Sequence, residues 1–415
     1  MLEEWLWERV SAGVLVAKPD TALARRSDRK IFRPRGINVT NAESSEMGIP
    51  KPAAPKSAAR RPRVPRPAVI SQTAVISRSR AQPRRPFVID FHAHVTVPEV
   101  VAFSKGHVVN TAVLEIPGAS KKVIEDWTKW RESLRVRLVD PQVRLREMDK
   151  MGVDVQVLTA SLVHMYTYWA DSETSLKMER LANDRIAAMV AVAPDRFVGL
   201  GGVPLQDPAA ALGELRRCMG ELKLRGVQIS SHAESMELGD PLLRPFWAEA
   251  EKLGAALYVH PAGVVEPRYR KFQLWNSIGQ PLEEALAMAS LFYEGVLDAY
   301  PKLKLCIAHG GGYLPYYAGR VDRNFREKWF TRTNMKKSPT EYMKKNFWYD
   351  SCVYNPDMLE FLVRKVGASR IVLGSDYPVG EADPVGFIRK ARGLSAADKE
   401  NILGRTAAKL LGLSI

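Results

Sequence analysis

The chain has 415 residues, of which 46% are hydrophobic, and a formal net charge of +15. This composition excludes a wholly disordered protein, because the apolar content is enough for a sizeable core. No apolar run is long enough to span a bilayer, which argues against a helical membrane protein. By length alone the chain could hold two or three domains, or one α/β barrel.

The positive charge is concentrated in the first 86 residues. They hold 18 Lys and Arg against 7 Asp and Glu, a net charge of +11, and 10 of the 27 prolines. Proline blocks helices and dense arginines repel one another, so residues 1–86 are predicted to be a disordered extension of a domain at residues 87–415. A basic arm can bind nucleic acid. We favour an extension without a role, and residues 33–86, which hold most of the basic residues, contain none of the aromatic residues that a stacking platform would require.

Location and cofactor use are constrained by what the sequence lacks. The chain begins with acidic residues where a secretory signal would be basic, so no signal peptide is predicted. No G-x-G-x-x-G motif opens a helix after a strand, so no nicotinamide or flavin site is predicted. A reducing, cytoplasmic location is expected because the cysteines are few and share no metal or redox spacing: Cys218, Cys306 and Cys352.

From residue 87 onward, short apolar runs alternate with amphipathic helical stretches. The helical stretches open near Asp-Pro or Pro, which suits the first turn of a helix, and two of them reach a glycine near their end, Gly152 and Gly254. Eight such units in about 330 residues predict an α/β fold, a (β/α)8 barrel of the TIM type. The strand candidates are residues 87–91, 155–158, 197–203, 226–229, 256–259, 303–308, 347–350 and 371–374.

An unusually long segment follows the first strand candidate. Residues 95–139 separate it from the helix expected near Asp140, whereas βα loops in barrels are short. Because an insertion at this position lies on the catalytic face, we expect the segment to roof a pocket. Its aromatic and basic residues are Trp127, Trp130, Arg131, Arg135 and Arg137.

Side chains that can bind a metal or move a proton follow four of the strand candidates. The run FVIDFHAH ends with His92 and His94, which lie two residues apart and so share one face of a strand. His260 follows the fifth candidate, His309 the sixth and Asp376 the eighth. Two histidines near a turn can be purely structural. Five such residues at the C-terminal ends of strands, where barrel enzymes work, indicate a functional site.

Three histidines and one carboxylate are a good ligand set for zinc or a similar divalent ion. We leave His309 off the metal, because the three glycines that follow it let the backbone approach a substrate. His309 is then available as a general acid or base. His164 and His232 also follow strand candidates, and we interpret them as packing or supporting residues rather than as pocket residues. The predicted metal ligands are His92, His94, His260 and Asp376.

Seven motifs spread over residues 87–413 carry a resemblance to a known family. They are DFHAH, DPQVRLREMDKMGVDVQVLT, RFVGLGGVPLQDP, GVQISSH, YVHP, LKLCIAHGGGYLPYYAGRVDR and VLGSDYP. With them the chain resembles the amidohydrolase superfamily, in its branch of non-oxidative decarboxylases. The resemblance implies one ion on the four ligands named above, with His309 as the catalytic histidine. Binuclear relatives carry a modified lysine after the fourth strand, where this chain has none.

The resemblance also implies a carboxylate-binding arginine. Arg320 lies eleven residues after His309 and matches an arginine that in such decarboxylases reaches into the neighbouring subunit's pocket, so a homodimer is expected. A guanidinium suits a carboxylate because it offers two parallel donors. Alternatively, Arg320 is a solvent-exposed helix residue without a role in substrate binding. Arg135 is a candidate second anchor from the inserted segment.

We therefore expect a metal-dependent, oxygen-independent decarboxylase of an aromatic or unsaturated carboxylic acid, which uses a metal-bound water, His309 and Asp376. The expected cofactor is one divalent ion, zinc before manganese or cobalt. The rival enzyme function is hydrolysis of a lactone, amide or C–C bond, or hydration of a ring-cleavage product, because fold and metal site are shared. Outside enzymes, the rival is a protein that binds nucleic acid through its basic arm, which we rank low because all five site residues are present.

Overall fold

The computed structural model describes residues 74–75, 85–104, 117–161, 167–261, 267–269 and 271–415. Nearly all of the predicted extension at residues 1–86 lies outside these ranges. Its described part includes a two-residue strand, β1 (Ala74–Val75), which pairs in parallel with β13 (Leu413–Ser414). Within the described ranges, no helix is both long enough and apolar enough to cross a membrane.

Strands form at all eight of the predicted positions, and the third of them is divided in two. Neighbouring strands pair in parallel, in the orders β2-β3-β4 and β5-β6-β9-β10-β11-β12. The strands are β2 (Ile89–Val95), β3 (Val155–Ala160), β4 (Phe197–Gly199) with β5 (Gly201–Gly202), β6 (Gly226–Ile229), β9 (Ala256–Val259), β10 (Lys304–Ile307), β11 (Phe347–Asp350) and β12 (Ile371–Val372).

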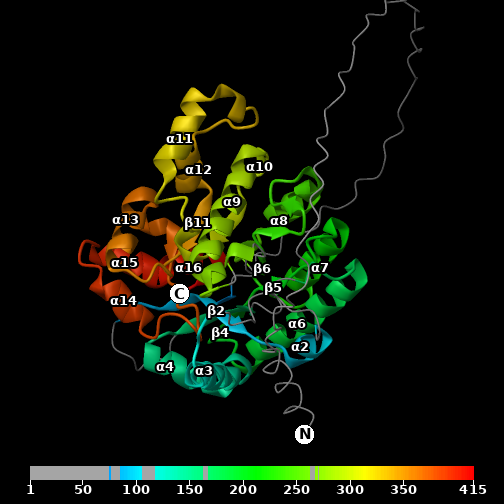
Figure 1. Ribbon diagram of the computed structural model, residues 1–415, viewed down its shortest axis with the longest axis vertical. Helices are drawn as coiled ribbons and strands as arrows, with labels where there is room; N and C mark the ends of the chain where they lie inside the picture. The colour runs from blue at the N-terminus through cyan, green and yellow to red at the C-terminus, as the bar shows by residue number, and fades with distance from the viewer. Residues whose placement is uncertain (1–73, 76–84, 105–116, 162–166, 262–266, 270) are drawn as a thin grey trace, which may run out of the picture. The chain divides into compact units, whose positions relative to one another are not determined.

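Backbone contacts close the two sheets into a barrel. Leu200, between β4 and β5, donates its N–H to the carbonyl oxygen of Leu158 on β3 at 3.0 Å. At the other seam, Phe91 donates to the carbonyl oxygen of Leu373 at 2.8 Å, and Ala93 forms a parallel bridge with Tyr377. The first strand therefore lies beside the last, which completes the predicted (β/α)8 barrel. Figure 1 shows strands at the centre with helices around them.

The helices begin and end at the signals that the sequence carries. Asp140 accepts a hydrogen bond from the N–H of Gln142 at 2.7 Å, and a proline follows it in the first helical turn. Gly152 and Gly254 end their helices in the left-handed conformation, with φ of 72° and 65°. The helices are α2 (Pro98–Phe103), α3 (Lys121–Val139), α4 (Pro141–Met151), α6 (Ser172–Val192), α7 (Pro208–Gly220), α8 (Arg244–Leu253), α9 (Gln280–Tyr293), α10 (Val296–Ala299), α11 (Ala318–Glu327), α12 (Pro339–Lys345), α13 (Pro356–Val366), α14 (Pro384–Lys390), α15 (Ala396–Glu400) and α16 (Thr406–Leu411).

Alternate strand residues face two different apolar regions. On β9, Ala256 and Tyr258 pack into the barrel interior together with residues of β2, β3 and α16. The intervening Leu257 and Val259 belong to the larger cluster that includes the surrounding helices. Because side chains of a strand alternate, His260, two residues after Tyr258, is directed to the interior side. The alternation of side chains along a strand therefore directs residues at the strand end, such as His260, toward the centre of the barrel.

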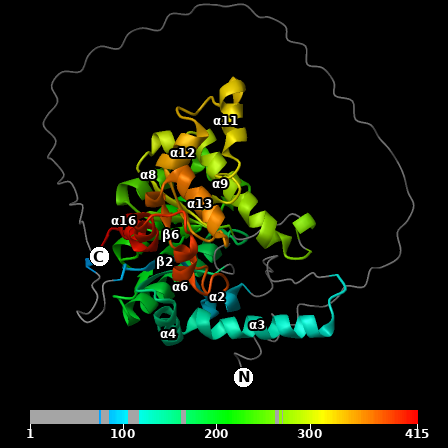
Figure 2. The ribbon, with the colours of Figure 1, turned by 90° about the vertical axis from the view of Figure 1, so that its left-hand side faces the viewer.

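The predicted insertion after the first strand contains two helices in its described part. Short α2 follows β2 closely, and the 19-residue α3 ends at Val139, directly before the residue that caps α4. Figure 2 shows α3 as a long helix beside α4. The insertion therefore supplies an extended helical element where a barrel ordinarily has a short loop.

Candidate metal centre and active site

A β-bulge in β2 brings both of its histidines to the barrel interior. The register between β2 and β3 shifts between Asp90 and Ala93, so that Phe91 and His92 together oppose one residue of β3. Phe91 and His92 both contact the ring of Tyr258, at ring-centre distances of 5.4 and 5.3 Å. In a regular strand, consecutive side chains would point to opposite faces. The bulge therefore adds a histidine to the interior face without displacing the apolar residue before it.

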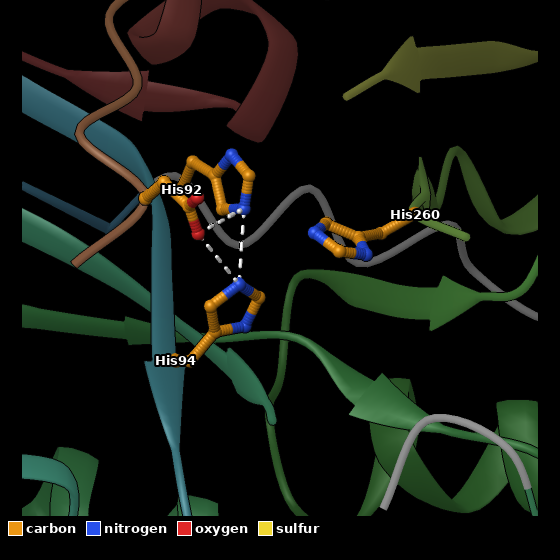
Figure 3. Close-up of side chains that lie close together, drawn as sticks. His92, His94 and His260 are labelled. Atoms are coloured by element: carbon orange, nitrogen blue, oxygen red, sulfur yellow. Dashed lines mark hydrogen bonds and ion pairs between the residues drawn. The ribbon is translucent and has the colours of Figure 1, made fainter. Parts of the chain in front are cut away.

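The four predicted metal ligands come together at the ends of β2, β9 and β12. His92, His94, His260 and Asp376 each place one ligand atom within 4.8 Å of the others. The Nε2 atoms of His92 and His94 lie 3.0 Å apart, and each lies 3.2 Å from Oδ1 of Asp376. Figure 3 shows His92 and His94 on one strand, with the ring of His260 facing them. All three histidines are buried.

Nδ1 of each of the three histidines donates a hydrogen bond to an oxygen atom. Nδ1 of His92 donates to Oδ2 of Asp350 at 2.7 Å, and Nδ1 of His94 and of His260 donate to backbone carbonyl oxygens at 3.1 and 3.0 Å. A proton on Nδ1 leaves Nε2 as an unprotonated acceptor that points inward. Nε2 of His260 is buried and has no hydrogen-bond partner among the described residues. Three converging lone pairs beside a carboxylate fit a divalent cation.

The electrostatic environment favours the protonation states that a metal requires. Burial lowers the pKa of His94, and burial with repulsion from the neighbouring histidines lowers that of His260 well below its usual value. Burial opposes ionisation of Asp376, but the adjacent histidines outweigh it and lower the pKa of that carboxyl. Oδ2 of Asp376 also accepts a hydrogen bond from the hydroxyl of Tyr354 at 3.1 Å. These pKa shifts favour neutral imidazoles at His94 and His260 and an ionised carboxylate at Asp376, the forms that can bind a cation.

Asp350 is a buried residue of the site that sequence reasoning did not assign. Its carboxylate accepts hydrogen bonds from His92 at 2.7 Å, from the hydroxyl of Tyr258 at 2.9 Å, and from the backbone N–H groups of Gly310 and Cys352, both at 3.1 Å. With His92 and Cys352 it forms a second compact group of metal-ligand types. Because its oxygens already accept from four donors, we interpret Asp350 as the support of His92. Its position as the last residue of a strand candidate was an available signal.

His309 lies two residues after β10 and beside the ligand cluster. Its ring centre is 5.0 Å from that of His260 and 5.3 Å from that of His92. Nδ1 of His309 donates to Oε1 of Glu284 on α9 at 2.5 Å. Burial lowers the pKa of His309, but the charge of Glu284 and this hydrogen bond outweigh burial and raise it to about 10. Burial raises the pKa of Glu284 to about 7. Sequence reasoning missed Glu284, because a glutamate within a helix carries no local signal.

A cavity of about 930 Å³ opens over the ligand cluster. Its lining includes His94, His260, His309 and Asp376, so the proposed metal and proton-transfer groups share one chamber. The inserted segment covers part of it, as the sequence predicts. The remaining wall includes aromatic rings from Trp275, Tyr313 and Tyr316, and the only lysine or arginine among the described lining residues comes from α3. The lining residues from the inserted segment include Trp127, Trp130 and Arg131.

Other residues singled out from the sequence lie elsewhere. Arg135, one turn after Arg131 on α3, forms an ion pair with Glu132 at 3.5 Å and is not among the lining residues. Arg320 is exposed on α11 and is likewise absent from the lining of its own chain's cavity. His232 lies 3.6 Å from a carboxylate oxygen of Glu283, outside the lining. Residues 107 and 164, two further histidines, lie outside the described ranges.

Comparisons with known proteins agree with this architecture. The chain is 40% identical over 278 residues to 2-amino-3-carboxymuconate-6-semialdehyde decarboxylase of Dictyostelium discoideum, which covers 66% of this chain and 77% of that protein. The structure of the present chain resembles that of 5-carboxyvanillate decarboxylase from Sphingomonas paucimobilis, with a TM-score of 0.70 and 28% sequence identity. The match covers 80% of this chain and 100% of the other.

A further similar structure contains a metal ion. Dihydroxybenzoic acid decarboxylase from Polaromonas, with bound manganese and the inhibitor 2-nitroresorcinol, has a TM-score of 0.66 and 26% identity, and the match covers 79% of this chain and 97% of that one. The family model described as Amidohydrolase matches residues 89–413, nearly the whole of the barrel. The protein is therefore a member of the amidohydrolase family.

Proposed function

We propose that this protein is a metal-dependent decarboxylase that removes carbon dioxide from an aromatic or unsaturated carboxylic acid without using oxygen. The observation that carries the proposal is the placement of His309 beside the four-ligand cluster, with three of its members, His94, His260 and Asp376, in the lining of the same cavity. The aromatic side chains in the wall can stack on a planar acid, and the polar groups in the lining can bind its oxygen atoms. The similar proteins named above are all decarboxylases, which supports the same reaction class.

The proposed reaction replaces a carboxylate by a proton on one carbon atom. When bound, a divalent ion supplies positive charge beside the substrate oxygens and acidifies a water molecule. His309 protonates the carbon that bears the carboxylate, using its cavity-facing nitrogen. The C–C bond then breaks, its electron pair restores the double bond, and carbon dioxide leaves. The product keeps this proton, and one proton taken up from solvent water, with Asp376 or His309 as its acceptor, restores the site for the next turnover. The step involves no net oxidation, so no electron acceptor is required.

We propose zinc as the ion, with manganese and cobalt as alternatives that the same ligand atoms can bind. Three imidazoles and one carboxylate are common zinc ligands, and imidazole also suits neighbouring transition metals. The manganese in the Polaromonas structure supports manganese as the strongest alternative. One ion is favoured over two, because Asp350 is committed to four hydrogen-bond donors and no lysine follows β6.

The test of the reaction class is a substrate panel run with metal-loaded enzyme. We expect release of one carbon dioxide per molecule consumed from one or more aromatic or unsaturated carboxylic acids, and no turnover of lactones or amides. The opposite pattern, with hydrolysis of lactones or amides and no release from any acid, would replace this proposal by a hydrolase of the same fold.

Arg131 is the residue that we expect to bind the substrate carboxylate within the cavity. Arg131→Leu should raise KM by about 10- to 100-fold, the scale of one lost charge-assisted hydrogen bond, with a smaller change in kcat. Steady-state kinetics on the acid identified in the panel measure this effect. Arg135→Leu is the matched comparison from the same helix. A larger effect at Arg135 would move the anchor to that residue, and an unchanged KM in both variants would remove the α3 arginines from carboxylate binding.

Arg320 is proposed to enter the partner subunit's cavity in a homodimer. Arg320→Ala and His309→Asn should each be strongly impaired, whereas co-expression of the two variants should restore up to about a quarter of wild-type activity. Half of randomly formed dimers are mixed, and each mixed dimer contains one site with neither substitution. Arg323→Ala is the control on the same exposed helix, where Arg323 pairs with Glu327 at 2.8 Å. Absence of recovery in a dimeric protein would show that Arg320 acts within its own subunit or has no role.

A further inference from the structure

The carboxylate of Glu284 lies behind His309 and takes no part in the reaction described above. It is fully buried on α9 and accepts the Nδ1 hydrogen bond of His309 at 2.5 Å. Its second oxygen, Oε2, has no hydrogen-bond partner in the described part of the chain. Burial of a carboxylate with one partner is unfavourable for folding, and polar groups left partly unsatisfied in this way are concentrated at functional sites.

The loop after His309 is shaped so that this contact can form. Gly312 has a φ of +60°, and a Cβ atom there would lie 2.1 Å from the carbonyl oxygen of Pro281 and 2.9 Å from Oε2 of Glu284. Pro281 lies in the first turn of α9, so the loop packs directly against the beginning of that helix. A side chain at residue 312 would separate the loop from α9 and lengthen the hydrogen bond. The glycine therefore serves the Glu284–His309 contact.

We propose that Glu284 is the positioning residue for His309, an inference that rests on the function proposed above. Its carboxylate fixes the rotation and the tautomer of the imidazole, because it accepts the proton on Nδ1. Nε2 is then the nitrogen that can face the cavity, where the substrate carbon is protonated. A proton donor held at one point reacts faster than one that rotates, since a small displacement of a reacting group costs a large factor in rate.

Three variants of α9 test the kinetic part of the inference. Glu284→Ala should lower kcat by about 100-fold with KM and metal content unchanged, because buried partners of active-site histidines contribute on this scale. Glu284→Gln keeps an oxygen at the same reach and should lose only about tenfold. Added formate should restore part of the activity of Glu284→Ala. Glu283→Gln is the control, because its carboxylate contacts Ser231 and His232 instead, and we expect near-wild-type kinetics.

A spectroscopic measurement tests the contact without reference to activity. In protein labelled with nitrogen-15 histidine, the Nδ1 proton of His309 should resonate far downfield, because it is shared with a buried carboxylate. His309→Asn assigns the resonance, which should disappear in Glu284→Ala and persist in Glu283→Gln. A resonance that persists in Glu284→Ala, or a kcat of this variant within about threefold of wild type, overturns the inference.

The two proposals fail in different ways. If the wild-type protein releases no carbon dioxide from any acid, the proposed decarboxylase function is wrong. The Nδ1 proton resonance alone then decides whether Glu284 positions His309. If decarboxylation occurs and Glu284→Gln is as active as wild type with the resonance unchanged, only the positioning role is lost. The glutamine variant also keeps the test valid if the alanine variant does not fold.

Discussion

Replacing His260 by alanine is expected to remove the bound metal ion and to abolish activity. The wild-type protein should contain about one equivalent of metal per chain, held by three imidazoles and Asp376. Nε2 of His260 has no hydrogen-bond partner among the described residues, and Nδ1 donates to the carbonyl oxygen of Pro261, so the substitution removes a ligand and one local hydrogen bond. We expect less than about a tenth of an equivalent of metal in this variant, and the same loss in Asp376→Ala. Elemental mass spectrometry of the purified proteins measures the content.

His232→Ala is the matched control for metal loss. His232 also follows a barrel strand, but it contacts Glu283 and lies outside the cavity lining. This variant should keep its full metal content. A full equivalent retained by His260→Ala would contradict the proposed ligand set, and two equivalents per wild-type chain would favour the rival hydrolase function.

Replacing His309 by asparagine is expected to lower kcat by about 10²- to 10⁴-fold while the metal stays bound. His309 lies in the cavity wall but is not one of the four clustered ligands, so its removal takes away proton transfer and leaves the metal donors in place. Asparagine is of similar size and cannot carry the proton. Steady-state kinetics and metal analysis on the same preparation measure both effects.

The pair of variants at His260 and His309 separates metal binding from proton transfer. Loss of metal from His309→Asn would make His309 a fifth ligand. Activity within about tenfold of wild type would remove it from the proton-transfer step, and Tyr354, which contacts Asp376 at 3.1 Å, would then be the next residue to test.

The fold was predictable because its signals are local and repeated. Each strand is an apolar run of a few residues, and Asp-Pro and glycine mark helix ends such as Asp140 and Gly152. The polar residues directly after these runs could be found in the same way, since parallel strands in a barrel end on one face. That rule places His92, His94, His260 and Asp376 at the same end of the barrel.

Features that depend on packing between distant segments were not predictable. The bulge in β2 is defined only by its pairing with β3, so the sequence of β2 alone does not reveal why Phe91 and His92 both face inward. Glu284 and His309 are 25 residues apart and meet because a loop packs on α9. Arg131 rather than Arg135 lines the cavity, a difference of one helical turn that depends on how α3 is rotated on the barrel.

The most direct test of whether the protein is a decarboxylase is to identify the product formed in isotopically labelled water. The metal-loaded enzyme is incubated with the acid identified in the panel, in deuterium oxide that is also enriched in oxygen-18. Decarboxylation predicts a product that has lost its carboxylate, carries one deuterium at that carbon and has gained no labelled hydroxyl, with an equal amount of carbon dioxide. A product that keeps its carboxylate and carries oxygen-18 would contradict the account and identify a hydrolase or hydratase.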